Sequence, residues 1–484
     1  MAGLISQLHE IHKSLPLSIR QASGWIRRKF VPHYIVGTKE FEEYFQFLQK
    51  SQWWSLEELR AYQLKKMKEV VLNAYEQTRF YRRLYDEHNF HPREIRSLDD
   101  IHRIPIITKE DVRNNLDDLI PIHFDKNKLR LWVTGGSTGT PLGIYQDKFS
   151  CDLYEGAFRW RQWSWAGYKF FDRKVQLKRE GINVIGKDGK EKCWDYNPHE
   201  NEVVLNSREM SEENLLQFVE IIQEFKPQFL VGFPSALEIF ARFVTRNHVQ
   251  LPPIKACFCE TEKLYDSQRL MIETAFNTRV FSGYGMSERT ADAVECEQHN
   301  GYHVSMEYGL FELVDQNMEP VTHPGGEGNV IGTGFFNHTM PLIRYLMNDI
   351  AVLATEPCPC KRKGILIKEF KGRLREYFVA RSGRLIPLQL VWSGRHPVWS
   401  KIREINFYQD KAGEVITRVV KAPQFSEEEI SRELKQEIGK ILKEDEFKVS
   451  FSFHDTLQLT HRGKLGFLEQ KLPISFEDLS KSVN

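Results

Sequence analysis

Hydrophobic side chains recur every three or four positions in the segment that begins at Ser55. This spacing places such side chains on one face of an α-helix. Ser55 and Glu58 stand three residues apart at its start, as the two partners of a capping box do. The segment therefore predicts an amphipathic helix whose apolar face carries Leu56, Leu59, Met67, Val70, Val71 and Ala74.

The middle of the chain alternates helix and strand patterns. Ser211 is a candidate N-cap for a helix over 212–225, Pro227 ends that helix, and the apolar run 228–231 predicts a buried strand. Ser235 and Glu238 suggest a second capping box. Further strands are expected at 254–259 and 278–282, with a helix over 266–276 between them. Such alternation predicts an α/β domain with a largely parallel sheet.

After about residue 300 the pattern changes to shorter β-like runs separated by Gly, Asn and Pro, at 308–315, 328–336 and 350–355. These runs predict a β-rich subdomain. The last part of the chain predicts two strands around a turn from Asp410 to Gly413, then a helix capped by Ser426 and Glu429, then a strand over 447–453. The expected fold class is α/β, with a large N-terminal domain over 1–371, containing mostly parallel sheets and the β-rich subdomain, and a small α+β domain over 372–484.

The composition is that of a folded globular protein of two or more domains, with 484 residues, 41% hydrophobic and 27% charged. Lys plus Arg, 67 residues, nearly balances Asp plus Glu, 66 residues, so no overall field attracts nucleic acid or an anionic membrane. Seven unevenly spaced cysteines favour a reducing compartment, and we expect the cytoplasm. No run reaches the roughly 18 apolar residues of a membrane span, and the basic stretch Trp25 to Phe30 is interpreted as a solvated helix face.

The segment Thr134 to Pro141, TGGSTGTP, combines three glycines with hydroxyl side chains. Glycine lets backbone N–H groups approach phosphate oxygens, and the hydroxyls add further donors. No Lys-Ser or Lys-Thr pair closes the loop, and strand patterns flank it on both sides, which excludes a Walker-type P-loop. On composition alone, an ordinary hairpin turn remains open as the alternative.

Five ordered segments carry a resemblance to a known superfamily. After the loop come SGYGMSE at 282–288, MPLIRYLMNDIAVL at 340–353, GRLRE at 372–376 and HRGKLGF at 461–467. Together they resemble the adenylate-forming superfamily of acyl-CoA synthetases and peptide-synthetase adenylation domains. The segments 62–85, 104–113 and 356–360 resemble its phenylacetate-CoA ligase branch, and more narrowly the CapK-like relatives encoded with capsular polysaccharide genes.

The resemblance implies an ATP site and a mobile C-terminal domain. It assigns the loop, Thr134, Gly135, Gly136, Ser137, Thr138 and Gly139, to the β- and γ-phosphates. It also assigns Tyr284, Gly285 and Ser287 to nucleotide binding, with Ser287 and Glu288 near the α-phosphate, and Glu288 to catalysis through Mg²⁺. Asp349 would bind the ribose hydroxyls, and Arg373 would lie near ribose or phosphate. Lys464 is assigned to catalysis. Lys464 would pair with the carboxylate and the developing phosphate charge. Each of these residues, taken alone, could simply be solvated.

Two departures from the superfamily pattern concern the loop and the hinge. Leu142 stands where many members carry Lys, so the loop depends on backbone donors, hydroxyls and Mg²⁺. Arg375 and Glu376 replace the usual pair of Asp residues at the hinge, around which the small domain normally rotates between half-reactions. We therefore expect acid activation more firmly than acyl transfer.

Cys358-Pro-Cys360 together with Cys296 and His303 offers three sulfurs and one imidazole. Such a set suits tetrahedral structural Zn²⁺. His299 is a weaker substitute for His303, and unligated buried cysteines are the alternative.

The expected reaction joins a small-molecule carboxylic acid, activated as acyl-AMP, to an amine or to coenzyme A. Phe233, Pro234, Glu262 and Tyr284 are candidates for the acid pocket by position. Two other functions stay open: nucleotidylation of a non-carboxylate hydroxyl, and a non-catalytic scaffold that keeps the fold. The sequence leaves the acid, the acceptor and the oligomeric state undecided.

Overall fold

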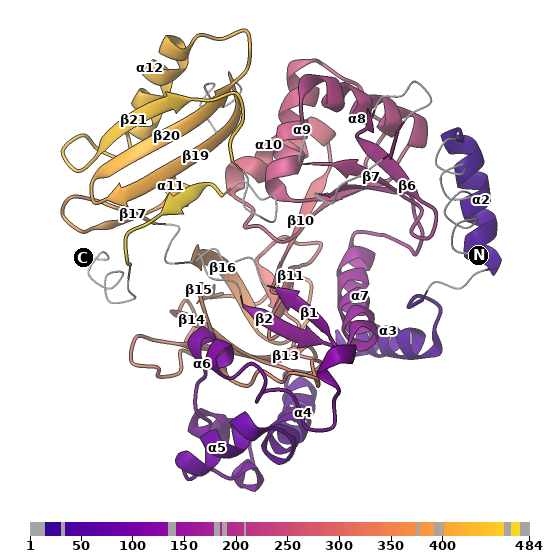
Figure 1. Cartoon of the computed structure of the whole chain (residues 1–484), viewed down its shortest axis with the longest axis vertical. Helices are drawn as coiled ribbons and strands as arrows, with labels where there is room; N and C mark the ends of the chain where they lie inside the picture. Colours follow the sequence, from indigo (N-terminus) through magenta and orange to yellow (C-terminus); the bar gives the residue numbers. More distant parts are fainter. Residues whose placement is uncertain are drawn as a thin grey trace. The chain divides into compact units, whose positions relative to one another are not determined.

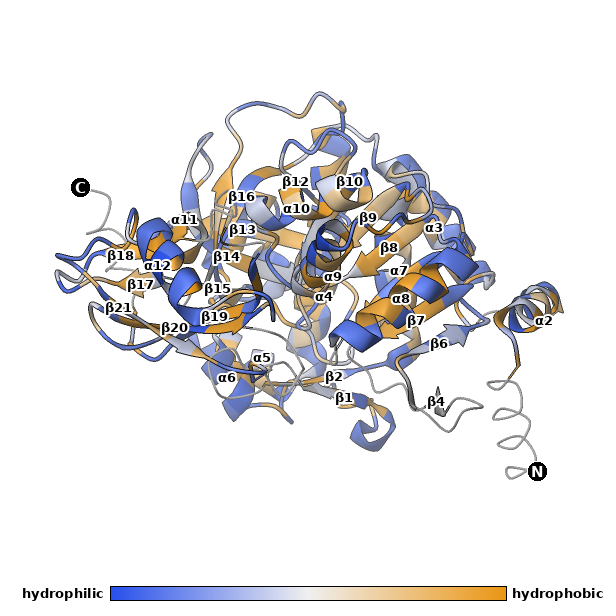
Figure 2. Ribbon diagram, turned by 90° about the horizontal axis from the view of Figure 1, so that it is seen from above, coloured by the Kyte–Doolittle hydropathy of each residue, from blue (hydrophilic) through white to orange (hydrophobic). Residues whose placement is uncertain are grey.

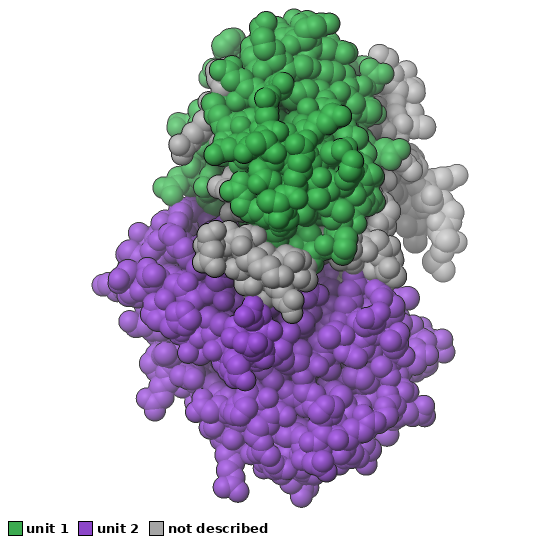
Figure 3. All heavy atoms as spheres, turned by 90° about the vertical axis from the view of Figure 1, so that its left-hand side faces the viewer, with its two compact units in different colours: residues 1–31, 169–280, 373–484 green, residues 32–168, 281–372 purple. Residues whose placement is uncertain are grey.

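The protein is described by a computed structural model, which covers residues 15–30, 34–133, 142–178, 184–185, 191–207, 210–373, 377–391, 398, 401–458 and 466–474. The chain forms two compact units, coloured in Figure 3. Unit 1 comprises Met1–Val31, Lys169–Val280 and Arg373–Asn484, and unit 2 comprises Pro32–Tyr168 and Phe281–Gly372. The chain therefore passes between the units four times, twice within a strand, at residues 280 and 281 and at residues 372 and 373.

Unit 1 contains the parallel sheet expected in the middle of the chain. Its strands are β3 (Lys174–Lys178), β6 (Trp194–Asn197), β7 (Glu202–Asn206), β8 (Phe229–Gly232) and β9 (Ala256–Cys259), with a short hairpin of β4 (Val184–Ile185) and β5 (Glu191–Lys192). Within this unit the order is β9-β8-β3-β7-β6. All neighbours in this order are parallel except β6, which pairs antiparallel to β7 at the edge. Strands β8 and β9 are buried along their whole length.

Three helices pack with these strands in one hydrophobic core: α8 (Glu212–Phe225), α9 (Pro234–Arg246) and α10 (Asp266–Phe276) (Figures 1 and 2). The Ser211 side chain accepts the backbone N–H of Asn214, and α8 ends before left-handed Lys226, so the predicted bounds are confirmed. The capping box predicted at Ser235 is wrong. Phe233 precedes α9 without a side-chain cap, because Pro234 needs no N–H partner at the first helical position. Glu238 instead lies buried in the helix, paired with Arg242.

The N-terminal helix α2 (Leu17–Phe30) packs on β6 through polar side chains. The guanidinium of Arg20 is buried and pairs with Asp195, and it also donates to the carbonyl of Tyr196 at 2.9 Å. The opposite face exposes Trp25 and Ile26. Among the described residues, no helix has the length and apolar character needed to cross a membrane.

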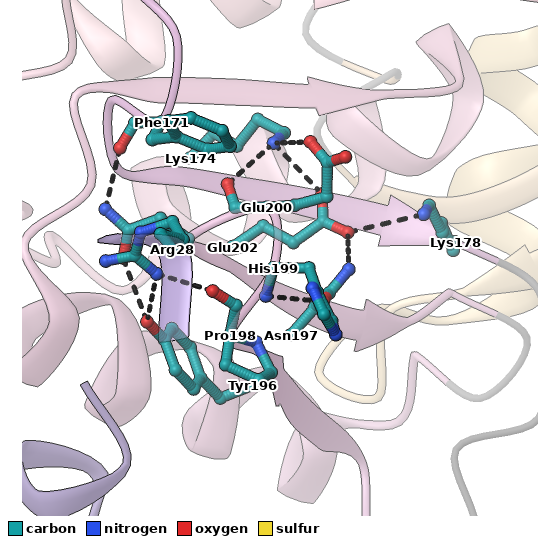
Figure 4. Close-up of polar contacts among 11 residues, drawn as sticks. Arg28, Phe171, Lys174, Lys178, Tyr196, Asn197, Pro198, His199, Glu200 and Glu202 are labelled. Carbon is teal, nitrogen blue, oxygen red and sulfur yellow. Dashed lines mark hydrogen bonds and ion pairs between the residues drawn. The ribbon is translucent and has the colours of Figure 1, made fainter. Parts of the chain in front are cut away.

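A second polar network fixes the hairpin of β6 and β7 (Figure 4). The ammonium of Lys174 is buried and lies 3.1 Å from the Glu200 carboxylate and 3.5 Å from that of Glu202. Glu202 also accepts from the amide of Asn197 at 3.0 Å. Lys174 and Glu202 begin β3 and β7, and ligands of open α/β sheets bind at the opposite, carboxyl ends of the strands. The network is therefore a structural support and not a catalytic site.

The C-terminal segment of unit 1 has the predicted α+β composition. Its elements are β17 (Tyr377–Val379), β18 (Leu385–Pro387), α11 (Leu388–Val391), β19 (Ile402–Lys411), β20 (Glu414–Lys421), α12 (Glu427–Ile438), β21 (Lys448–Phe453) and β22 (Leu468–Gln470). The sheet order is β21-β20-β19-β22. Ser426 caps α12 as predicted, and Ile430, Leu434 and Ile438 of this helix are buried.

The first part of unit 2 is helical, with one β-hairpin before its last helix. The helices are α3 (Lys39–Ser51), α4 (Leu56–Gln77), α5 (Arg79–Glu87), α6 (Lys109–Asn114) and α7 (Lys148–Trp165), with 3₁₀ turns η1 (Pro92–Glu94), η2 (Leu98–Arg103) and η3 (Lys126–Lys128). Helix α4 has the predicted capping box of Ser55 and Glu58. Leu56 departs from the predicted apolar face: it is 45% exposed, because it precedes the turn at which the buried side begins.

The β-rich part of unit 2 is an antiparallel sheet. It consists of β10 (Arg279–Gly285), β11 (Asp292–Glu295), β12 (Tyr302–Val304), β13 (Gly309–Val314), β14 (Glu327–Gly334), β15 (Tyr345–Leu353) and β16 (Leu366–Arg373). The order is β13-β14-β15-β16-β12-β11-β10. The β-rich texture predicted after residue 300 thus begins some 20 residues earlier, at β10.

Candidate functional site

Two antiparallel strands flank the glycine-rich loop. β1 (Arg130–Val133) pairs with β2 (Gly143–Gln146), and Val133 faces Gly143 across the pair. The strands predicted on either side of the loop are therefore confirmed, and the helix that would follow a Walker loop is not there. The loop residues Thr134, Gly135, Gly136, Ser137, Thr138 and Gly139 lie outside the described residues. Leu142, at the position of the absent cation, is 1% exposed and belongs to the core.

Strand β2 connects the loop to two other motif segments. The side-chain amide of Gln146 donates to the backbone carbonyl of Ser287 at 3.2 Å. The backbone carbonyl of Tyr145 accepts from the Asn337 amide at 3.1 Å and from the Thr339 hydroxyl at 3.2 Å. Asn337 and Thr339 lie just before the segment that begins at Met340, so β2 contacts the segment 282–288 and the start of the segment 340–353 within unit 2.

Tyr284 and Asp349 meet in the same unit. The phenol of Tyr284, near the end of β10, donates to Oδ2 of Asp349 in β15 at 2.7 Å. The Tyr284 ring stacks on Phe370 of β16, with ring centroids 3.8 Å apart and planes 7° from parallel. Phe370 thus covers one face of the Tyr284 ring, and the pair forms an aromatic platform beside a carboxylate.

An irregularity in β15 determines where Asp349 lies. Asn329 pairs with Ile350 and Ile331 with Leu346, so three residues of β15 oppose the single residue Val330 of β14. Such a bulge kinks the strand and redirects its side chains. Asn348, in this bulge, has a left-handed φ of 59°, and Asp349 is 6% exposed.

The backbone after Glu288 packs closely on β14. A Cβ at Gly334 would stand 2.3 Å from the Arg289 carbonyl oxygen, so only glycine fits there. Arg289 has a φ of 56°, pairs with Glu155 at 2.9 Å and donates to the Cys151 carbonyl at 3.2 Å. These contacts fix the backbone on the C-terminal side of Ser287 and Glu288, whose side chains are half-buried, and Gly285 is exposed.

Behind this segment lies a buried polar network. Asp292 stands opposite Gly285 in the β10–β11 register and accepts from the Ser305 hydroxyl. Arg161 donates to Ser305 at 2.7 Å and pairs with Glu307 at 2.9 Å. Burial raises the pKa of Asp292 to about 6, against the lowering effects of Ser305 and Arg161. The network supports the strands that carry Tyr284 from inside the unit.

Other predicted site residues lie outside the described residues or belong to unit 1. Lys464, Arg375 and Glu376 lie outside the described residues, and Arg373 ends β16 with only its backbone described. Phe233, Pro234 and Glu262 belong to unit 1, whereas Tyr284 belongs to unit 2. In unit 1 the Glu262 carboxylate accepts the backbone N–H of Ser235 at 3.2 Å, at the first turn of α9.

The four predicted metal ligands lie together in unit 2. The ligand atoms of Cys296, His303, Cys358 and Cys360 all lie within 4.8 Å of one another. Cys296 Sγ is 3.6 Å from Cys358 Sγ, and Cys360 Sγ is 3.3 Å from His303 Nε2. All four cysteine and histidine side chains come from the β11–β12 turn and the connection between β15 and β16.

Burial sets the protonation of this cluster. Burial, and secondarily the nearby Arg362, lowers the pKa of His303 to about 4, so the imidazole is neutral at neutral pH. Burial raises the pKa of Cys296 and of Cys358 above the ordinary thiol value. His299 is not part of the cluster: its ring packs on Phe281 and lies 3.8 Å from Glu295.

Three residues of these sites are not predictable from their own sequence patterns. Phe370 looks like a core residue of a strand, and only its position two residues before Gly372 connects it with a motif. Gln146 follows the loop by five residues, in a strand. Arg362 follows Cys360 by two residues, a proximity that could have drawn attention to it.

Comparisons with known proteins identify relatives that agree with the resemblance of the motifs. No family model matches the chain. Protein CapK of Staphylococcus aureus is 26% identical over 434 residues, which cover 88% of this chain and 90% of CapK. A phenylacetate-coenzyme A ligase of Thermus thermophilus is 25% identical over 350 residues, covering 69% of this chain and 74% of the ligase.

Among solved structures, a 2-hydroxyisobutyryl-CoA ligase in the postadenylation state, in complex with 2-HIB-AMP, matches with a TM-score of 0.67. The identity is 18%, and the match covers 87% of this chain and 93% of that one. This likeness confirms the predicted mixed α/β fold. CapK and the phenylacetate-coenzyme A ligase are 26% and 25% identical to this chain, and this similarity supports the resemblance of the ordered motifs to the phenylacetate-CoA ligase branch of the adenylate-forming superfamily, with its CapK-like relatives.

Proposed function

We propose that this chain is an ATP-dependent acid ligase that forms an acyl-adenylate, releases pyrophosphate and passes the acyl group to an acceptor. The observation that carries the proposal is the junction in unit 2 of strand β2, which follows the loop, with two motif segments: Tyr284 to Glu288, and the segment containing Asp349. Relatives named phenylacetate-coenzyme A ligase support acid activation as the reaction.

In this proposal the nucleotide binds to unit 2. Asp349 would accept the ribose hydroxyls, and the aromatic platform of Tyr284 and Phe370 offers a flat apolar surface at 3.8 Å ring spacing beside that carboxylate. The hydroxyls of Thr134, Ser137 and Thr138 and the glycine N–H groups of the loop would bind the β- and γ-phosphates. Ser287 would lie near the α-phosphate, and Arg373 would add positive charge near ribose or phosphate.

Glu288 suits Mg²⁺, because that ion takes one or two protein carboxylates together with phosphate oxygens. The carboxylate of Glu288 is half-buried and follows directly on Ser287. When bound, Mg²⁺ would neutralise phosphate charge. We assign no catalytic role to zinc. An ion bound by Cys296, His303, Cys358 and Cys360 would stabilise the fold.

The chemical step joins two anions. A carboxylate oxygen of the acid attacks the α-phosphorus, a P–O bond forms, and the bond to the β-phosphate oxygen breaks with pyrophosphate as the leaving group. Lys464 would pair with the carboxylate and with the charge that develops on the α-phosphate. Coenzyme A is the acceptor that the names of the ligase relatives support, and an amine is the alternative expected from the sequence.

The test is acid-dependent ATP/pyrophosphate exchange across a panel of aryl, fatty and amino acids. We expect exchange with at least one acid in the absence of any acceptor. Hydroxylamine added to the same reaction should yield a hydroxamate, which only an activated acyl group can form. Exchange without hydroxamate would instead indicate nucleotidylation of a hydroxyl, and no exchange with any acid would favour a scaffold without catalysis.

A further inference from the structure

We infer that Cys296, His303, Cys358 and Cys360 bind one structural Zn²⁺, and that Arg362 is the charge partner of this centre. The inference is independent of acid activation. It starts from the donor set, because three cysteine sulfurs and one imidazole nitrogen are a standard tetrahedral set for structural zinc.

Two ligand distances are close to those that one central ion requires, and all four ligand atoms lie within 4.8 Å of one another. Zinc bonds of about 2.3 Å to sulfur and 2.0 to 2.1 Å to nitrogen, at tetrahedral angles, put neighbouring ligand atoms roughly 3.6 to 3.8 Å apart. The sulfurs of Cys296 and Cys358 are 3.6 Å apart, and Cys360 Sγ is 3.3 Å from His303 Nε2. These cysteines are free thiols, so no disulfide competes for the same sulfurs.

Backbone N–H groups are directed at two of the sulfurs. The N–H of Gln298 lies 3.4 Å from Cys296 Sγ, and the N–H of Cys360 bonds to the Cys358 sulfur. Each N–H belongs to the residue two positions after the cysteine whose sulfur accepts it. Such bonds stabilise a thiolate and orient it toward a metal, as partners of metal ligands generally do.

The turn that carries two of the ligands has a fixed shape. Cys296 directly follows β11, and His303 lies in β12 opposite Val294. Between them, His299 and Gly301 have left-handed φ values of 51° and 96°. A Cβ at Gly301 would stand 2.4 Å from the Ile367 carbonyl oxygen, so the turn packs directly on β16.

Arg362 would compensate the net charge of the zinc centre. Zn²⁺ with three thiolates and a neutral imidazole carries a net charge of −1, which a buried site must compensate. The Arg362 side chain is 7% exposed, and the ring of Trp165, over which it lies, has its centroid 6.4 Å from that of His303. Its guanidinium stacks on Trp165 at 4.0 Å and on Trp53 at 4.8 Å, and pairs with Glu297 at 2.9 Å.

A zinc ion here would be structural. All four coordination positions are filled by protein atoms, and catalytic zinc sites keep one position open. The ion would join the β11–β12 turn to the connection between β15 and β16, the strands that carry Asp349 and Phe370. It would therefore stabilise the sheet that presents the aromatic platform.

The experiment measures zinc content and ligands without ATP or acid, so its outcome does not depend on the proposed function. We expect about one zinc per chain in wild-type protein, lost in His303→Ala and Cys360→Ser. The matched controls, His299→Ala and Cys259→Ala, should keep it, because both residues are buried outside the cluster. Arg362→Gln should keep its fold and release zinc to a chelator some 10 to 100 times faster or bind it correspondingly more weakly.

X-ray absorption of the wild-type protein provides a second measurement if the ligand variants fail to fold. We expect three sulfur ligands near 2.3 Å and one nitrogen near 2.0 Å. Wild-type protein that binds no zinc even after refolding with the metal would overturn the inference. So would a ligand set without three sulfurs, a disulfide between Cys296 and Cys358, or equal zinc loss in His299→Ala and His303→Ala.

Discussion

At the scale of single residues, Tyr284 makes two interactions that mutation can separate, the hydrogen bond to Asp349 and the stack on Phe370. Tyr284→Phe removes the first and keeps the second, and we expect the KM for ATP to change by less than about threefold. Asp349→Asn removes the charge that would hold the ribose. Hydrogen bonds to charged groups contribute about 1.5 to 3 kcal/mol each, so we expect this KM to rise roughly 10- to 100-fold.

The measurement is ATP/pyrophosphate exchange as a function of ATP concentration, with thermal unfolding to confirm that each variant folds. Glu327→Gln is a suitable control, because this carboxylate lies at the start of neighbouring β14 and pairs with Lys371 at the surface. If Tyr284→Phe were as damaging as Asp349→Asn, the hydrogen bond between the phenol and the carboxylate, and not the charge of Asp349 alone, would be the important interaction.

The residues of this site were predictable to different degrees. Tyr284, Asp349 and the four cluster residues are predictable because each stands in a short motif whose residue types suit the chemistry. That His303 and not His299 joins the cluster follows from the β11–β12 register, which places His303 opposite Val294. Phe370 and Arg362 depend on packing between distant strands and segments, and no local pattern encodes that packing.

At the scale of elements, the network at the start of β3 and β7 should be a major support of unit 1. Lys174 and Glu202 are 3% and 2% exposed, and removing one partner of a buried pair leaves an uncompensated charge, which costs about 3 to 5 kcal/mol. We therefore expect Lys174→Met to lower the free energy of unfolding by that amount. Lys174→Met/Glu202→Met should recover most of the loss. Urea denaturation of the variants measures both effects.

Lys178→Met is the matched control for this element. Lys178 contacts the same Glu202 carboxylate at 3.6 Å, but its side chain is 33% exposed. Exposed pairs contribute about 0 to 1 kcal/mol, so the control should be nearly neutral. A double variant less stable than Lys174→Met would show that the hydrogen bonds to Asn197 and Glu200 matter more than the ion pair.

Element bounds were predictable where a polar side chain caps a helix. Ser55, Ser211 and Ser426 each accept a backbone N–H at the predicted position. The prediction at Ser235 failed because Pro234 occupies the first helical position, so the helix begins without a side-chain cap. The bulge in β15 was also beyond prediction, since it depends on how β14 pairs with that strand.

At the scale of the whole molecule, the α/β class was predictable because helix and strand periodicities alternate along the chain. The order of strands was not. β3 lies between β7 and β8, and β12 pairs with β16 across more than 60 residues of chain. Periodicity says which face of a strand is buried, not which strand lies beside it. The composition of the two units from separate chain segments follows from those pairings.

This organisation leads to a prediction about Lys464. The residues proposed to bind the nucleotide, Tyr284, Glu288 and Asp349, belong to unit 2, and Lys464 falls in the sequence range 373–484, which is assigned to unit 1. Lys464→Ala should therefore leave ATP affinity within about threefold of wild type. It should slow acid-dependent exchange by about 100-fold or more, the loss typical of a group that stabilises transition-state charge.

Equilibrium ATP binding and exchange rates, measured on the same preparation, separate the two effects. Lys471→Ala is the control, because Lys471 is an exposed lysine in the same segment that pairs only at the surface with Glu469. A near-normal exchange rate in Lys464→Ala would remove this lysine from the chemistry. Loss of ATP affinity in parallel with the rate would instead make it a nucleotide-binding residue, because a group that acts only in the transition state lowers kcat without weakening the ground-state complex.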